Sequence, residues 1–421
     1  LNGVPPFQEF YDFGICKWKS IYKGFYEPWH IIKCPTPAEP YGKRKLFCMG
    51  MGQAVCQEMA SLIWSEKCTI RVALGDSETQ PLDDFVNDVL RKNNFWTKLG
   101  KQIEQELALG GAAINVWYDG EIKLGYAMAD QFIPTDWDNA GVKGGIFIHK
   151  KAKDGVYYTR LEWHQWTPEG EYKITNMLFK SPDQSILGDS APLNEAYAGI
   201  TPESIVENAP ESLFAYYSTA NSNNIDDNSP LGVSVYSNAL DTLNGLDITY
   251  DSLIRDFRLG KSRIIAPAWA LKPTIDEHDN LVRMFDTDTE TYEAINTGVD
   301  DTAGINFIAP PLRVNEHVEA LNAHLSTLCL QTGFSSGTFT FDKATGLKTA
   351  TEIISENSKT YKTIRAQQDQ IKPAIEHVVR NILTLAQLYE IQWQGNNIAK
   401  LAALPYEIKI TFDDSILQDR Q

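Results

Sequence analysis

The chain is poor in positive charge. Its 421 residues include 38 Lys and Arg against 55 Asp and Glu, a formal net charge of −17 at pH 7. Broad, tight binding to a phosphate backbone needs a surplus of cations, so this composition argues against a protein that grips nucleic acid over a wide surface. It leaves open a protein that lets nucleic acid pass without holding it.

Long hydrophobic runs and targeting signals are also absent. No apolar stretch reaches the roughly 20 residues that a helix needs to cross a bilayer. The start of the chain, residues 1–6, lacks the basic and apolar regions of a secretory signal. We therefore expect no membrane partner. Because the sequence begins without Met and stops abruptly, we expect both termini to be trimmed.

Cysteine is scarce and shows no pairing pattern. No two cysteines form a CxxC pair, and their spacings match no zinc motif. We interpret them as reduced packing thiols, with disulfides or a bound metal as the alternatives. Five of the six fall in the first 68 residues: Cys16, Cys34, Cys48, Cys56, Cys68 and Cys329.

Motifs of enzyme chemistry are missing as well. There is no HExxH zinc motif and no GxSxG nucleophile elbow. Gly260-Lys261-Ser262 has the ending of a phosphate-binding loop, but Arg255 stands where that motif needs a glycine. His317 and His324 lie two turns apart on one predicted helix. We interpret them as solvated or interface histidines, with a pH sensor or an intersubunit metal as alternatives. We predict no catalytic residue, no metal and no cofactor.

What is present is a large folded chain. Hydrophobic residues make up 43% and aromatic residues 11% of the sequence, and the length predicts two or more subdomains. Hydrophobic periodicity in the first half predicts both helices and strands. The helices are Gly50 to Ser65, Pro81 to Asn93 and Phe95 to Leu109; the strands are Thr69 to Leu74, Ala112 to Tyr118, Ile122 to Tyr126, Ile146 to Lys150, Tyr157 to Trp166 and Tyr172 to Phe179.

The second half is built around long helices. The polar loop from Asn221 to Pro230 marks a subdomain boundary, and it is followed by a predicted helix from Leu231 to Leu259. A second predicted helix spans Asn315 to Leu330, and short strands and acidic loops lie between the two. After a polar loop, Ser335 to Lys348, the sequence Thr349-Ala350-Thr351-Glu352 fits a capping box at the start of a third helix of nearly forty residues. A helix this long usually bridges parts of a large assembly.

Carboxylates beside aromatic residues raise a competing interpretation. Glu162 with Trp163 and Trp166 on one predicted strand could form a sugar-binding surface with a catalytic acid. A packed aromatic strand pair is the simpler reading, since sequence alone does not bring two carboxylates together. An acidic polysaccharide hydrolase therefore stands as an alternative function.

The order of several motifs resembles the portal proteins of tailed bacteriophages, in particular the group typified by the SPP1 portal. The matching stretches cover most of the chain, and the most specific is Thr349-Ala350-Thr351-Glu352-Ile353-Ile354-Ser355-Glu356-Asn357-Ser358-Lys359-Thr360. The others are Ile21-Tyr22-Lys23-Gly24 with Trp29, the helix around Met51 to Trp64, Asn94 to Leu99, Ala108 to Ala113, Ala129 to Pro134 and Ser229 to Ser234.

The resemblance implies an α+β portal fold: a mixed α/β wing, a two-helix stem, a small β-rich clip insert and a long kinked helix. The crown, usually a further helical segment, is expected to be short or absent. The implied divisions are a wing at 1–228, stem helix 1 at 229–260, a clip at 261–313, stem helix 2 at 314–333, a tunnel loop at 334–348, a long kinked helix at 349–395 running from the wing toward the crown, and a C-terminal strand region at 396–421 that returns to the wing.

The resemblance also implies a non-enzymatic role in the virion. Portal proteins form rings, usually dodecamers, at one capsid vertex, where double-stranded DNA enters under the terminase motor and later leaves. The implied partners are other copies of the chain, the terminase large subunit, a head-completion or adaptor protein, the major capsid and scaffolding proteins, and DNA passing non-specifically through the channel. Assembly would take place in the host cytoplasm. Another structural capsid or connector protein is the second alternative, beside the polysaccharide hydrolase.

Three sets of residues follow from this mapping. Some of the acids on the first stem helix would face the channel and repel phosphates: the candidates are Asp241, Asp247, Asp251 and Asp256. The tunnel loop would project toward DNA, with its lysines making brief contacts: Thr338, Phe339, Thr340, Phe341, Asp342, Lys343 and Lys348. Pro373 would kink the long helix, because proline removes a backbone hydrogen bond and clashes with the preceding turn.

Overall fold

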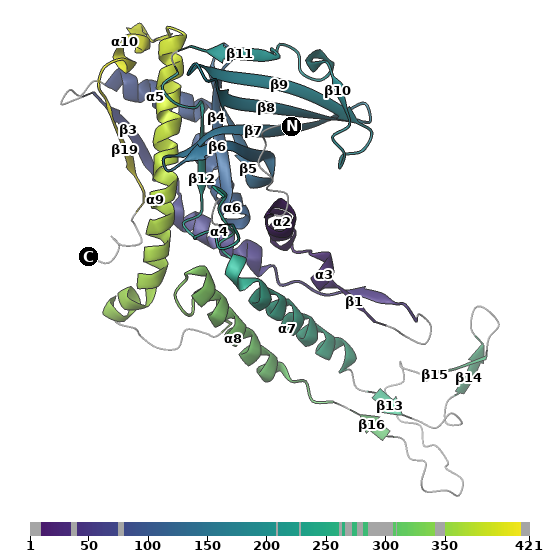
Figure 1. The fold of residues 1–421 in the computed structure, drawn as a ribbon. Helices are drawn as coiled ribbons and strands as arrows, with labels where there is room; N and C mark the ends of the chain where they lie inside the picture. The colour runs from purple at the N-terminus through teal and green to yellow at the C-terminus, as the bar shows by residue number, and fades with distance from the viewer. Residues whose placement is uncertain are drawn as a thin grey trace, which may run out of the picture.

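The computed structural model describes residues 10–34, 40–74, 80–207, 209–226, 229–260, 263–265, 272–275, 281–284, 306–308, 310–341 and 350–413. This part of the chain contains runs of helices and runs of antiparallel strands, which makes the fold α+β as expected. Figure 1 shows a large mixed region, which we call the body, and a pair of helices, α7 (Leu240–Leu259) and α8 (Val314–Thr332), that extend away from it.

The helical layer of the body contains α4 (Met51–Ile63), α5 (Gln80–Lys92) and α6 (Phe95–Leu109). Before them come a π-helical turn η1 (Tyr11–Ile15), α2 (Cys16–Tyr22) and the short α3 (Glu27–His30). On α6, Phe95, Leu99, Ile103 and Leu107 are fully buried at every fourth position, which is the spacing of one helix face. The predicted helices are confirmed here to within two residues at each end, and the predicted bounds of α6 match the observed ones.

The two larger sheets of the body are antiparallel. One has the order β12 (Phe214–Ser218), β4 (Gly111–Tyr118) and β5 (Ile122–Met128). The other runs β10 (Asp189–Ala191), β9 (Tyr172–Ser181), β8 (Val156–Trp166), β7 (Gly141–Lys153) and β6 (Phe132–Asp138), with β11 (Glu203–Val206) also pairing with β9. Strands β7, β8 and β9 follow one another as a meander, as the sequence predicted.

The long helix α9 (Ala350–Leu388) is part of the core of the body. It packs along β12 and β4, with Ile375, Val379, Ile382 and Ala386 at most 1% exposed. The expectation that this helix mainly bridges an assembly is therefore incomplete, because its C-terminal half closes the core of the protomer itself. The helix ends at Leu388, short of the predicted region boundary at 395, and the two-residue strands β17 (Gln392–Trp393) and β18 (Asn396–Asn397) follow it.

The C-terminal part returns to the N-terminal part of the body. After α10 (Ile398–Ala402), β19 (Glu407–Thr411) pairs antiparallel with β3 (Thr69–Ala73). Ile410 stands opposite Ile70, and both side chains are buried. The segment that was predicted to return as a strand contains β19, which pairs with β3.

The start of α7 differs from the prediction. The sequence predicted a helix from Leu231, but the helix begins at Leu240, after a one-turn 3₁₀ helix at Ser237–Ala239. Residues 231–236 instead make tertiary backbone contacts: Val235 donates to the carbonyl of Leu107 at 2.9 Å. Gly232 and Gly110 approach so closely that a Cβ on either would lie within 2.3 Å of the other's carbonyl oxygen. This packing overrides the local helical periodicity.

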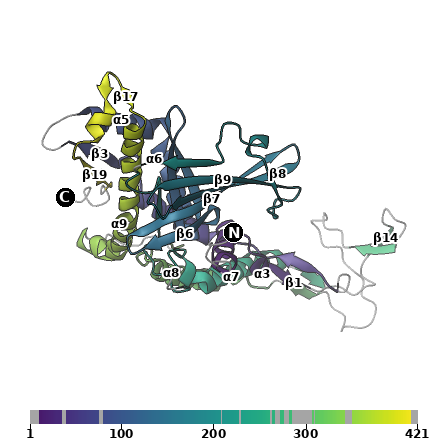
Figure 2. The ribbon, with the colours of Figure 1, turned by 45° about the horizontal axis from the view of Figure 1, so that its top comes forward.

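Short strands lie at the far end of α7 and α8 (Figures 1 and 2). β13 (Arg263–Ile265) pairs with β16 (Asn306–Ile308), and β14 (Lys272–Ile275) pairs with β15 (Leu281–Met284), all antiparallel. A small β-rich insert between the two helices was expected, and these pairings agree with it. A further hairpin, β1 (Ile31–Lys33) with β2 (Lys43–Lys45), lies beside α7 in Figure 1.

Candidate channel-forming elements

The α7–α8 pair is held by apolar and ionic contacts. Leu246 of α7 and Leu325 and Leu328 of α8 are at most 2% exposed. Toward the far end, the Asp256 carboxylate accepts hydrogen bonds from Arg313 at 3.0 Å and from His317 Nε2 at 2.9 Å. The pKa of Asp256 is lowered, first by the hydrogen bond from His317 and then by the hydrogen bond and charge of Arg313. His317 thus has an acidic partner within its own chain.

Two of the four predicted channel acids are not available to a channel. Asp247 and Asp251 are 6% and 2% exposed. Asp247 accepts from the backbone N–H of Met49 at 2.7 Å and lies 3.0 Å from His30 Nε2, while Asp251 is bound by Arg44. The expectation for these two residues is corrected, because both carboxylates face the β1–β2 hairpin and the segment after it. The four acids are spaced so that they lie on more than one face of the helix. The sequence alone does not show which of these faces the hairpin covers.

The other two acids have different surroundings. Asp241 is exposed in the first turn of α7, and Asp256 is partly buried beneath Arg313 and His317. Their place relative to a channel stays a prediction, and Asp241 is the stronger candidate because its carboxylate faces solvent within the described part of this chain.

The loop after α8 is anchored at its start. Phe334 is 1% exposed and its ring meets that of Phe339 edge-on at 5.2 Å. The backbone N–H of Ser335 donates to Thr360 Oγ1 of α9 at 2.8 Å, and Thr363 Oγ1 donates to the carbonyl of Gly333 at 2.8 Å. These hydrogen bonds between loop backbone and α9 side chains tie the start of the loop to α9, so the loop does not project from its first residue.

The loop residues of the prediction therefore divide into two groups. Phe339 packs against the core, and the Phe341 N–H donates to Asn322 Oδ1 of α8 at 3.0 Å, although the Phe341 side chain is 53% exposed. Thr338 and Thr340 are exposed. Asp342, Lys343 and Lys348 lie outside the described residues, as does the start of the predicted capping box at Thr349.

Pro373 lies within α9, which continues on both sides of it, and its ring is on the exposed side of the helix. Nearby polar side chains hold the buried side. Asn381 Nδ2 and His377 Nε2 both donate to the carbonyl of Ser212, at 3.0 and 2.8 Å, and Arg380 donates to Glu211 at 2.6 Å. The proline accounts for one missing helical hydrogen bond. A kink at this residue stays a prediction.

The carboxylate that suggested a hydrolase is part of a buried ion cluster. Glu162 accepts from His149 at 3.1 Å and from His164 at 2.9 Å, and it pairs with Arg160 at 2.8 Å. Burial by itself would raise the pKa of Glu162, but these hydrogen bonds and the charge of Arg160 hold it well below the ordinary value. A glycosidic acid needs a raised pKa, so Glu162 is unsuited to that role.

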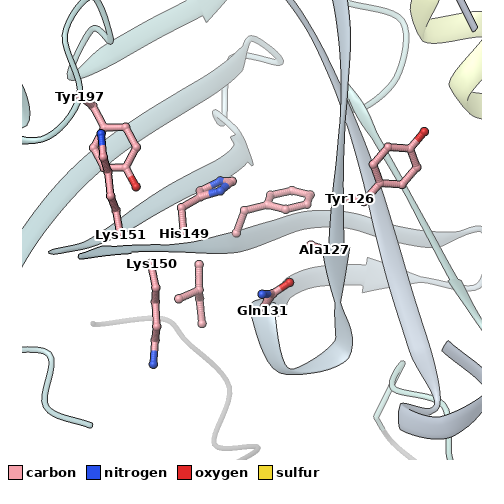
Figure 3. Close-up of a pocket in the computed structure, with 9 residues that line it drawn as sticks. Tyr126, Ala127, Gln131, His149, Lys150, Lys151 and Tyr197 are labelled. Carbon is pink, nitrogen blue, oxygen red and sulfur yellow. The ribbon is translucent and has the colours of Figure 1, made fainter. Parts of the chain in front are cut away.

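A pocket of about 360 Å³ lies beside this cluster and is drawn in Figure 3. Lys151 and Tyr197 lie together on one side of it, Tyr126 lies on the other, and Lys150 points to the opposite side of the strand. Lys151 Nζ donates to the carbonyl of Ala196 at 3.0 Å. No carboxylate is among the lining residues, so the paired acids that glycoside hydrolysis requires are not found in this pocket.

The contacts that the sequence did not predict join segments far apart in the chain. Arg44 reaches Asp251 across 207 residues, and His30 reaches Asp247 across 217. No local motif marks such pairs. The one available signal was the concentration of cationic residues in the β2 strand, Lys43-Arg44-Lys45, in an otherwise acidic chain.

A comparison with known proteins identifies the family to which this chain belongs. The fold combines a body built on antiparallel sheets, an extended helix pair that carries a β-rich insert, and a long helix in the core. The sequence profile of the family described as "Phage portal protein, SPP1 Gp6-like" matches residues 15–421. The chain belongs to this family of phage portal proteins, which is a structural family, and it is a component of phage-type particles.

Solved structures offer one further comparison. The chain is similar to a chain of a structure titled "Neck of empty GTA particle computed with C6 symmetry", with 12% sequence identity and a TM-score of 0.47. The similarity covers 87% of this chain and 83% of that one. A search of curated proteins finds no match. Among the residues that the structure describes, no helix combines the length and apolarity that crossing a bilayer requires.

Proposed function

We propose that this portal protein assembles as a dodecameric ring at one capsid vertex and forms the channel through which double-stranded DNA is packaged and later ejected. The observation that carries the proposal is the family match over residues 15–421. The terminase large subunit would supply the ATP-driven work, and a head-completion or adaptor protein would dock after packaging. The major capsid and scaffolding proteins would surround the ring, which would be assembled in the host cytoplasm.

In this proposal the body is the wing, the α7–α8 pair is the stem, and the insert between them is the clip. The stem then lines the channel, and the net charge of −17 limits adhesion of the phosphate backbone. Asp241 is the described stem acid that we place on the channel side, and residues 338–348 form the loop that meets DNA.

The test is direct imaging of the purified full-length chain. Negative-stain microscopy should show rings with a central hole, and light scattering should give a mass that is twelve times the 47.3 kDa of one chain. A mass of one chain at all accessible concentrations, with no ring particles, would contradict the proposal. Rings of another copy number would contradict only the dodecamer.

A further inference from the structure

Three potential metal ligands from distant parts of the chain meet beside α7. They are His30 at the end of α3, Cys48 after β2, and Asp247 in the middle of α7. One ligand atom from each lies within 4.8 Å of the other two, and His30 Nε2 is 3.0 Å from Asp247 Oδ2. Among the residues that the structure describes, this is the one such group of three.

The chemistry of this donor set is that of zinc. Imidazole nitrogen, thiolate sulfur and carboxylate oxygen are the three ligand types that proteins use for Zn²⁺, at bond lengths of about 2.0 to 2.3 Å. Atoms around a tetrahedral ion with such bonds lie roughly 3.2 to 3.8 Å apart. The 3.0 Å separation of His30 and Asp247 and the 4.8 Å limit for the whole group bracket that spacing, so a small movement of side chains would suffice.

Backbone groups orient each ligand. The Met49 N–H donates to Asp247 Oδ1 at 2.7 Å, which leaves Oδ2 directed at His30. The Gly50 N–H donates to Cys48 Sγ at 3.2 Å. Such second contacts fix the direction of metal ligands in known sites.

The contacts of His30 show what metal binding at Nε2 would change. Its Nδ1 accepts from the Tyr26 N–H at 2.8 Å and also lies 3.1 Å from the Tyr26 carbonyl oxygen. With Nδ1 as the acceptor, Nε2 carries the proton and donates to Asp247 at 3.0 Å. Metal binding at Nε2 requires the other tautomer, in which Nδ1–H turns from the Tyr26 N–H to the Tyr26 carbonyl oxygen. The metal then takes the place of the proton between His30 and Asp247.

Burial strengthens the case for a specific ion. His30 is 1% exposed and Asp247 is 6% exposed, while Cys48 is partly buried and leaves a route from solvent. A buried carboxylate needs hydrogen-bond donors or a cation to replace its water, and Asp247 has only the Met49 N–H and His30 in contact with it among the hydrogen bonds described above.

We propose that His30, Cys48 and Asp247 form a zinc site that fastens the segment around the β1–β2 hairpin to α7. A water molecule would complete the coordination as the fourth ligand. The inference does not depend on the proposed function, because it concerns contacts within one chain. It adds a metal where sequence spacing predicted none, since the three ligands are 18 and 199 residues apart and fit no local motif.

The test uses Co²⁺ as a spectroscopic substitute for Zn²⁺ in the full-length protein. Protein stripped with a chelator and dialysed is titrated with Co²⁺, then with Zn²⁺. We expect a thiolate-to-cobalt charge-transfer band in the near ultraviolet that saturates at one equivalent per chain, together with strong visible bands of a four-coordinate ion. One equivalent of Zn²⁺ should abolish both, and elemental analysis should find one zinc per chain after desalting.

Variants assign the signal to this cluster. Cys48→Ser should lose the near-ultraviolet band, and Asp247→Asn should weaken Co²⁺ binding by at least tenfold. Cys34→Ser, a partly buried cysteine of the same N-terminal region outside the cluster, is the matched control and should bind like the natural chain. The proposal is overturned if the natural chain shows no charge-transfer band, or if Cys48→Ser keeps it. The first of these outcomes needs no variant, so it stands even where a substitution prevents folding.

Discussion

Arg44 of β2 donates two parallel hydrogen bonds to the carboxylate of Asp251 in α7, at 2.7 and 2.5 Å. The backbone N–H of Phe47 donates to the same carboxylate at 3.2 Å. The Asp251 side chain is 3% exposed and that of Arg44 is 25% exposed. This bidentate pair joins α7 to the N-terminal hairpin and keeps the Asp251 carboxylate away from solvent.

Replacing Asp251 with Asn should destabilise the protein by about 2 to 3 kcal/mol, because it leaves the Arg44 guanidinium poorly compensated. The hydrogen bonds from Arg44 also lower the pKa of Asp251, so its contribution to stability is present above the unfolded pKa of about 3.9 and is lost as the pH falls through the lower folded value. Denaturant midpoints between pH 3 and 7 measure both effects.

Asp241→Asn, at an exposed position of the same helix, is the control and should change stability little. The double variant Arg44→Met with Asp251→Asn should lose less than the sum of the two single losses, since neither group is then left unpaired. Additive losses would show that the two side chains are not coupled.

A second prediction concerns Glu106, which is fully buried on α6 with neither carboxylate oxygen in a described hydrogen bond. Burial raises its pKa well above the ordinary value, so the folded state keeps a proton that the unfolded chain loses. The free energy of unfolding should therefore fall as pH rises from about 4.3, by at most about 1.4 kcal/mol per pH unit, until the folded pKa is passed.

Glu106→Gln keeps the shape without the ionisation, so it should be more stable than the natural chain at pH 8 and nearly equal to it at pH 4. Glu121→Gln, at an exposed position, should match the natural chain at both values. Equal pH profiles for Glu106→Gln and the natural chain would mean that Glu106 does not titrate abnormally. Thermal unfolding in matched buffers provides the measurement.

A third prediction follows from the close approach of α7 and α8 at Gly245. A Cβ added there would lie 2.9 Å from the His324 ring, which can rotate slightly to accept a methyl group. Gly245→Ala should be nearly neutral, because gained helix propensity offsets the contact. Gly245→Leu should cost about 1 to 3 kcal/mol by forcing the helices apart. Ser326→Leu adds the same side chain on an exposed face of α8 and should cost less.

A fourth prediction tests the loop in the proposed channel. Reversing the charge of both Lys343 and Lys348 to Glu should impair DNA packaging while leaving ring assembly intact, because repulsion of phosphates would replace brief attraction. Packaging of protected DNA in an assembly reaction is the readout. Lys101→Glu with Lys400→Glu changes the charge equally at exposed body positions and should package normally. Normal packaging by the loop variant would remove the loop as a DNA contact.

Local regularity explains which predictions the structure confirmed. The bounds of α6 followed from an apolar residue at every fourth position and from Gly110, whose φ of 93° ends the helix as glycine readily does. The meander of β7, β8 and β9 followed from β-prone runs separated by turn residues such as Asp154-Gly155, where both φ angles are positive. These signals act within a few residues.

Other predictions failed where distant segments compete with a local pattern. Residues 231–239 have helical periodicity, yet the contact of Gly232 with Gly110 and the bond from Val235 to Leu107 hold them outside α7. Asp247 and Asp251 look like solvated helix acids in the sequence, but the hairpin region covers them. Glu162 beside two tryptophans suggested a catalytic acid until His149, His164 and Arg160 were found around it.

The sequence by itself determined that the chain is acidic, α+β, divided by long helices and similar in motif order to phage portals, because composition, periodicity and ordered motifs are properties of the chain in one dimension. Only the tertiary structure decided which acids are buried, that α9 closes the core, and that His30, Cys48 and Asp247 meet. Those outcomes depend on which surfaces pack together, and burial sets the charge state and the partners of a side chain more strongly than its neighbours in sequence do.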